Sequence, residues 1–421
     1  MPGYSEDGWK TLHEVGSQYW WETTGRDLAN MLHAAEYPEH IQQAFLSYYN
    51  DFICPHLGDA DGSTHEYSFE IRGSTKTLYV RFVADFSQLR PVDWDNPLNC
   101  ARTETVIASL ASRAPGFDDT WYRALKKSLD HSHLPAPAQK ALIAEAGHLT
   151  PLLIGFDIYR DIPKGSDMLP VMGKAYFLPC FAAAAQKKTR FEILRTAILD
   201  LPGISSRPNI LRSLSLLEEY LTSKSKDWEN GARFLSTDLV SPDKARLKLY
   251  LRCPVNSFEV IWDYFTLGGR IPGLGIAKDS YLKFVSILGG AGLNYLSTTA
   301  PVAGEGIETG NRRKLTTVYF SLDDKHPFPA PKLAFCVRNV AANDVVVVRG
   351  LDRWLSSHGW DDGETSMEDY ISSSRTHRKL IEKPGIFTFI GLARKDPTGE
   401  LSIQTYLCPE LYESPRPSEK P

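Results

Sequence analysis

Five pairs of strand-like segments recur along the 421 residues, and helical patterns separate each pair from the next. We expect the pairs at about residues 65–72 with 76–85, 151–158 with 170–178, 233–239 with 244–252, 315–322 with 331–337, and 385–394 with 400–407. Strands that follow each other closely pair antiparallel, and helices between the pairs cover the outside of the sheet. The pattern therefore predicts an α+β fold in which an antiparallel sheet closes into a barrel, and argues against a doubly wound parallel sheet.

The segments between the strand pairs have the spacing of helices. We expect helices at about residues 26–36, 39–53, 99–113, 117–130, 136–146, 191–198, 210–221, 256–266, 278–289, 343–357 and 366–379. The residues from Pro409 onward are rich in proline and charge. We therefore predict one domain over residues 1–408 and a disordered tail over residues 409–421.

Charge and cysteine content limit the class of partner. The net charge is -4 and no basic tract dominates, so we expect no nucleic-acid partner. The six cysteines are scattered without metal-ligand spacing, and no apolar run is long enough to span a membrane. With no signal sequence visible, we expect a reduced cytoplasmic protein that binds small molecules and no membrane, and a homodimer is left open.

The stretch Arg246–Tyr250 reads Arg-Leu-Lys-Leu-Tyr, so polar and apolar side chains alternate as they do in a strand. The turn Ser241-Pro242-Asp243 before it favours a central hairpin strand. Arg246, Lys248 and Tyr250 then share one face. Two cations and a phenol on one small patch are suited to a polyanion.

The same alternation returns in other predicted hairpins. Tyr79 and Arg81 share a face, as do Lys174 and Tyr176, whereas Lys332 has no aromatic partner two residues away. The last strand carries Ser402, Gln404 and Tyr406 on one face. A single strand of this kind would turn such residues to solvent. Because helices are expected outside the barrel, the repetition instead predicts a polar barrel interior.

Such an interior has the groups needed to ionise an allylic diphosphate. Cations can hold the diphosphate through charge-assisted hydrogen bonds worth about 1.5–3 kcal/mol each. Tyrosine rings beside them can stabilise the carbocation that remains, by about 2 kcal/mol or more when desolvated. Glu66, which shares a face with Ser68 and Glu70, can accept the N–H of an indole, although an exposed strand glutamate is an equally good reading.

In order along the chain, several short motifs resemble the fungal aromatic prenyltransferases of the dimethylallyltryptophan synthase family. They are Trp20-Trp21 with Thr24-Gly25, Pro55-His56-Leu57-Gly58, Glu66-Tyr67-Ser68, Lys174–Pro179, Arg246–Tyr250, Thr266–Arg270 and His358-Gly359-Trp360. Each is weak alone, and the resemblance runs from about Trp20 to Tyr412. It implies a ten-stranded antiparallel barrel built from α-β-β-α units, the ABBA fold. It also implies prenyl transfer from an allylic diphosphate, the co-substrate, to an indole, with no metal or other cofactor.

The resemblance also implies residue roles. Glu66 resembles the carboxylate that binds the indole nitrogen, and Lys174 is implied both as a diphosphate ligand and as the proton acceptor in rearomatisation. The implied diphosphate ligands are Arg81, Lys174, Arg246, Lys248 and Lys332, and the implied tyrosine shield is Tyr176, Tyr250 and Tyr406. Two positions depart from the family pattern, because Ala334 and Ser402 stand where shield tyrosines are usual. With Thr317 also small, this predicts a longer donor or leakage to prenyl alcohol.

Other enzyme classes fit less well. The pairs Asp118-Asp119, Asp323-Asp324 and Asp361-Asp362 lack the third Asp of a magnesium-binding Asp-Asp-x-x-Asp motif, so we interpret them as caps or turns. The Gly268–Gly275 stretch lacks dinucleotide spacing. Two alternatives stay open: ionisation of a longer prenyl diphosphate such as farnesyl diphosphate, with capture by water or by its own alkene, and a noncatalytic binder of prenyl or indole ligands.

Overall fold

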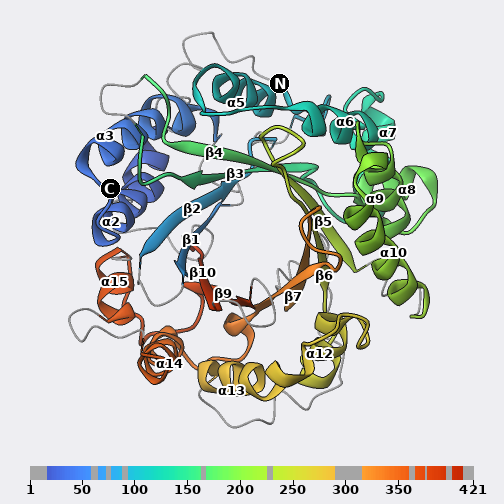
Figure 1. Ribbon diagram of the computed structural model, residues 1–421. Coiled ribbons are helices and arrows are strands. Elements are labelled where there is room, and N and C mark those ends of the chain that lie inside the picture. Colours follow the sequence, from blue (N-terminus) through green and yellow to red (C-terminus); the bar gives the residue numbers. More distant parts are fainter. Residues whose placement is uncertain are drawn as a thin grey trace.

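Ten antiparallel strands close into a barrel in the computed structural model (Figure 1), which describes residues 17–57, 65–72, 77–87, 93–162, 167–224, 231–289, 315–359, 366–374, 377–394 and 401–410. The strands are β1 His65–Arg72, β2 Leu78–Ala84, β3 Leu152–Ile158, β4 Val171–Phe177, β5 Ala232–Asp238, β6 Leu247–Arg252, β7 Thr317–Leu322, β8 Ala330–Phe335, β9 Phe387–Arg394 and β10 Leu401–Leu407. Each strand pairs with its neighbours in the chain, and β10 pairs with β1. The five predicted hairpins and the closure are therefore confirmed.

Helices surround the barrel and follow the strand pairs in sequence order (Figure 1). They are α2 Arg26–Ala34, α3 Glu39–Tyr48, α4 Cys54–His56, α5 Ala101–Arg113, α6 Thr120–Leu129, α7 Ala136–Ala146, α8 Cys180–Gln186, α9 Arg190–Leu199, α10 Pro208–Thr222, α12 Phe258–Thr266, α13 Lys278–Gly289, α14 Asp344–Ser357 and α15 Met367–Ser374. The sequence missed α8, and it extended the last helix too far, because α15 ends at Ser374. The predicted helix 39–53 continues beyond α3 as a π-helical turn, Tyr49–Ile53.

Successive side chains along each strand point alternately into the hydrophobic core beneath the outer helices and into the barrel interior. In β6, Leu247, Leu249 and Leu251 are fully buried in the hydrophobic core that also contains residues of the outer helices. Tyr250 has the opposite parity, and its ring faces the ring of Tyr176 from β4. The apolar face therefore anchors the strand to the helices, and this leaves the polar face free to build a site.

Near its C-terminal end the described chain is fixed by a buried ionic cluster. Glu410 accepts hydrogen bonds from Arg378 Nε at 2.6 Å and from His377 Nε2 at 2.7 Å. Arg378 also donates to Asp344, the first residue of α14, at 2.6 Å. Gly385 has φ +144°, and a Cβ there would lie 2.4 Å from Glu410 Oε1, so only glycine fits. Glu410 is thus folded, residues 411–421 lie outside the described residues, and the predicted boundary at 408 stays a prediction.

Candidate active site

Charged side chains of alternating sign line the inside of strands β1 to β6. Neighbouring strands place Arg81 opposite Asp157 and Lys174 opposite Asp238. We call the whole set the charge belt; it consists of Glu70, Arg81, Asp157, Lys174, Asp238, Lys248 and, directly before β6, Arg246. The belt brings four of the five predicted diphosphate ligands together.

One half of the charge belt centres on Arg81 and Asp157. Arg81 Nη2 lies 2.5 Å from Glu70 Oε2, and Arg81 Nε lies 3.2 Å from Asp157 Oδ1. The second oxygen of Asp157 accepts a hydrogen bond from the ammonium group of Lys174, whose side chain is 5% exposed. Because each buried charge has a counter-charge within contact distance, the belt can exist inside a folded barrel.

The other half of the charge belt centres on Asp238. Arg246 Nε donates to Asp238 Oδ2 at 2.7 Å, and Lys248 Nζ lies 3.6 Å from Asp238 Oδ1. The Asp238 side chain is only 3% exposed, whereas that of Arg246 is 44% exposed. The carboxylate is therefore buried behind a guanidinium group that an anion can reach.

The charge belt contains four basic groups and three carboxylates, so it carries more positive than negative charge when its lysines are protonated. Burial lowers the pKa of Lys174 and lowers that of Lys248 well below its ordinary value, and the neighbouring arginines lower both further. Burial would raise the pKa of Asp157 and Asp238, but the adjacent cations outweigh it, so both pKa values fall. The carboxylates are thus ionised, and an added anion would relieve the crowding of the cations.

Four tyrosines gather beside the charge belt. The Tyr250 ring lies 6.1 Å from that of Tyr176 and 4.7 Å from that of Tyr319. Burial raises the pKa of Tyr406 well above 10.0, and the nearby Tyr319, Tyr250 and Tyr176 raise it further. We call Tyr176, Tyr250, Tyr319 and Tyr406 the tyrosine cluster. All three predicted shield residues are in it, and Tyr319 is a fourth member that the sequence analysis missed.

Lys332 belongs to a separate polar chain on β8, β10 and β1. Lys332 Nζ donates to Gln404 Oε1 at 2.7 Å, and Gln404 Nε2 donates to Ser68 Oγ at 3.0 Å. The ammonium lies 5.9 Å from the centre of the Tyr319 ring. A Cβ on Gly391 would lie 3.0 Å from Lys332 Cε, so the glycine makes room for this lysine. Lys332 thus contacts the tyrosine cluster, while its predicted role as a diphosphate ligand stays a prediction.

The two departures from the family pattern lie near this chain. Ala334 is paired with Thr317 on one side and Gly391 on the other, so three small residues adjoin. Ser402 Oγ donates to Glu70 Oε1 at 3.1 Å and so supports the charge belt. Neither Ala334 nor Ser402 adds an aromatic ring to the tyrosine cluster, whereas Tyr319 of β7 does.

Glu66 lies on the same face of β1 as Glu70 but four residues away, about 13 Å along a strand. Its carboxylate raises the pKa of Tyr406, although less than burial and the other tyrosines do. Glu66 is therefore next to the tyrosine cluster and separated from Glu70 in the charge belt.

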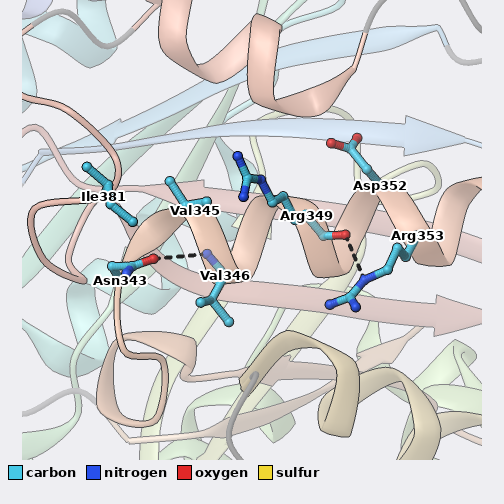
Figure 2. Close-up of a pocket in the computed structure, with 7 residues that line it drawn as sticks. All are labelled: Asn343, Val345, Val346, Arg349, Asp352, Arg353 and Ile381. Carbon is cyan, nitrogen blue, oxygen red and sulfur yellow. Dashed lines mark hydrogen bonds between the residues drawn. The ribbon is translucent and has the colours of Figure 1, made fainter.

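A groove on the outside of the barrel is not part of this arrangement. Figure 2 shows Asn343, Val346 and Arg353 along α14, with Ile381 facing its first turn. Arg353 Nε donates to the carbonyl oxygen of Arg349, so this arginine is engaged by its own helix (Figure 2). We therefore assign the site to the barrel interior.

The described aspartate pairs have structural roles. Asp119 bonds Arg123 one helical turn later at 2.8 Å, and Asp323 Oδ1 accepts the backbone N–H of Lys325 at 2.9 Å. In the described part of the chain, no three His, Cys, Asp or Glu side chains form a metal-binding group. Asp361-Asp362 lies outside the described residues. All six cysteines are free.

Comparison with known proteins identifies the family. The family model described as tryptophan dimethylallyltransferase matches residues 16–370. The chain belongs to this family. It is 48% identical over 413 residues to the prenyltransferase phnF of Penicillium herquei, covering 94% of this chain and 92% of that protein. It is thus an aromatic prenyltransferase, as the sequence predicts.

Two further matches add detail. The 4-O-dimethylallyl-L-tyrosine synthase of Claviceps purpurea is 29% identical, over 96% of this chain and 90% of that protein. The crystal structure of NotF with brevianamide F and DMSPP has a TM-score of 0.76 at 18% identity, covering 93% of this chain and 94% of that one. That structural likeness confirms the ABBA barrel. None of the described helices combines the length and apolar character of a membrane span.

Proposed function

We propose that the protein transfers a prenyl group from an allylic diphosphate to an indole by electrophilic aromatic substitution. The C–O bond to the diphosphate breaks with its electron pair on oxygen, an aromatic carbon bonds the allylic cation, and a ring proton leaves. The observation that supports this most is the excess of basic over acidic groups in the charge belt next to the tyrosine cluster.

The charge belt would hold the diphosphate. Arg81, Arg246 and Lys248 face the interior, and each charge-assisted hydrogen bond to a phosphate oxygen is worth about 1.5–3 kcal/mol. The low pKa of the buried Lys248 supports this role, because an anion would stabilise its ammonium form. With several cations available, we infer that no divalent metal is needed.

The tyrosine cluster would surround the allylic cation. The electron-rich faces of desolvated rings stabilise a cation by about 2 kcal/mol or more. Phe234, whose ring lies 5.7 Å from that of Tyr250, extends this aromatic wall. The rings also keep water from the cation, so the acceptor captures it.

Glu66 would bind the acceptor beyond the tyrosines. Its carboxylate can accept the indole N–H and stabilise the positive charge that develops on the attacked ring. For proton removal, Lys174 stays the predicted acceptor: burial lowers its pKa and so favours the neutral amine that this step needs. Its hydrogen bond to Asp157 opposes that role, since it favours the ammonium.

A phenolic acceptor is the second candidate. The Claviceps purpurea relative is named for a tyrosine ether, and 29% of its aligned residues are shared with this chain. A phenol O–H can donate to Glu66 in place of an indole N–H. We therefore expect an indole and a phenol to bind at the same site, and product analysis distinguishes between them.

The test is product analysis with purified protein. Dimethylallyl, geranyl and farnesyl diphosphates are each incubated with indoles, phenols or no acceptor, with and without excess EDTA, and products are identified by mass spectrometry. We expect a prenylated indole that forms equally well with EDTA. A prenylated phenol alone would replace the first candidate by the second, and prenyl alcohol or cyclised hydrocarbon alone would favour the longer-donor alternative.

A further inference from the structure

The charge belt contains carboxylates as well as cations, although its proposed ligand is an anion. A site for a diphosphate is weakened by every fixed negative charge beside its cations, yet Asp238 lies 2.7 Å from Arg246 and 3.6 Å from Lys248. Asp157 has the same relation to Lys174 and Arg81. Each carboxylate thus bonds or contacts two cations that the diphosphate would also use.

In the empty barrel these contacts are required. Lys174 and Lys248 are nearly inaccessible to water, so without a counter-charge their ammonium groups would be strongly disfavoured. Asp238 lies opposite Lys174 on the neighbouring strand, and its charge also favours the ammonium of that lysine. The two aspartates therefore offset part of the cost of burying these ammonium groups and hold the lysines in place while no substrate is bound.

We propose that Asp157 and Asp238 are built-in counter-anions that the diphosphate partly displaces on binding and that re-form their ion pairs as it leaves. This inference rests on the proposed function and adds how the site releases its product. Arg246 is the residue at which the exchange occurs, because its side chain is 44% exposed while that of its partner Asp238 is 3% exposed. The carboxylates act through the cations, so they are positioning residues.

The substitution Asp238→Asn separates charge from position. The amide has the same shape, and its oxygen can still accept from Arg246 Nε, so the geometry is retained while one negative charge is lost. Inorganic diphosphate should then bind at least about tenfold more tightly, equivalent to about 1.4 kcal/mol. A residue that only holds its neighbours in place would give weaker binding instead.

The experiment measures the dissociation constant of inorganic diphosphate by calorimetry at about pH 6, because protonation of the two lysines is more favoured there than at neutral pH. It also compares single-turnover with steady-state rates of prenyl transfer. We expect Asp238→Asn to bind diphosphate more tightly and to lose steady-state rate while retaining its single-turnover rate. Asp263→Asn is the matched control, since Asp263 pairs with Lys224 at 2.7 Å outside the barrel and should change neither value.

Unchanged or weaker diphosphate binding by a folded Asp238→Asn protein would overturn the inference. If this variant does not fold, the same measurement on Asp157→Asn decides the question in the same way. Failure of the proposed function would look different, because the unaltered protein would then neither bind diphosphate nor form a prenylated product.

Discussion

Replacing Lys248 by methionine should weaken donor binding without unfolding the protein. The change removes one charge-assisted hydrogen bond to the diphosphate, worth about 1.5–3 kcal/mol, so the dissociation constant of the donor should rise by about 10- to 150-fold. The loss to the fold should be small. Lys248 Nζ is 3.6 Å from Asp238, and Arg246 keeps its shorter 2.7 Å bond to the same carboxylate.

The assay is calorimetric titration with a thiolodiphosphate donor analogue, together with thermal unfolding. Lys224→Met is the matched control, because Lys224 pairs with Asp263 at 2.7 Å on the helical layer. The control should bind the analogue as the unaltered protein does. Unchanged binding by Lys248→Met would show that Lys248 does not hold the diphosphate. A collapse of its melting temperature would show that Lys248 is structural, and either result contradicts the proposed role.

Three further predictions test other parts of the molecule. Glu66→Gln should lower the single-turnover rate with an indole by about 10²–10⁴-fold, and an unchanged rate would remove Glu66 from acceptor binding. Ala334→Tyr should fill the space beside Thr317 and shift product ratios from geranyl and farnesyl donors, and from prenyl alcohol, toward the dimethylallyl product; a wild type that already uses only the short donor contradicts this. Burial would raise the pKa of Glu410, but hydrogen bonds from His377 and Arg378 lower it to about 2. The ionised carboxylate therefore stabilises the folded protein above about pH 4.5, and this stabilisation is lost as the pH falls toward 2. Glu410→Gln should therefore lose up to about 3 kcal/mol of unfolding free energy at pH 7 and little near pH 2; equal losses at both would contradict the assignment.

Much of the fold could be predicted because the spacing of apolar residues along the sequence differs between helices and strands. The Arg246–Tyr250 stretch has a strict period of two, and its leucines do anchor β6 to the outer helices. Helix α8, Cys180–Gln186, was missed because its run of alanines has no apolar stripe. The length of α15 was overestimated, since periodicity says little about where a helix ends.

The cations of the site could also be predicted, but their partners could not. Asp157 stands between Phe156 and Ile158, and Asp238 stands between Thr237 and Leu239, so neither is marked in the sequence as the partner of a cation. Only the pairing of β2 with β3 and of β4 with β5 brings them to Arg81 and Lys174. The parity of Tyr319 with Thr317 was a usable signal for the fourth tyrosine.

The most direct test of the proposed function is a crystal structure of the protein with a thiolodiphosphate donor analogue and its preferred aromatic acceptor. We predict that the diphosphate oxygens bind Arg81, Arg246 and Lys248, that the allylic carbon lies among the rings of the tyrosine cluster, and that the acceptor N–H or O–H donates to Glu66. A diphosphate bound outside the barrel, or an acceptor on the far side of the tyrosines from Glu66, would contradict it.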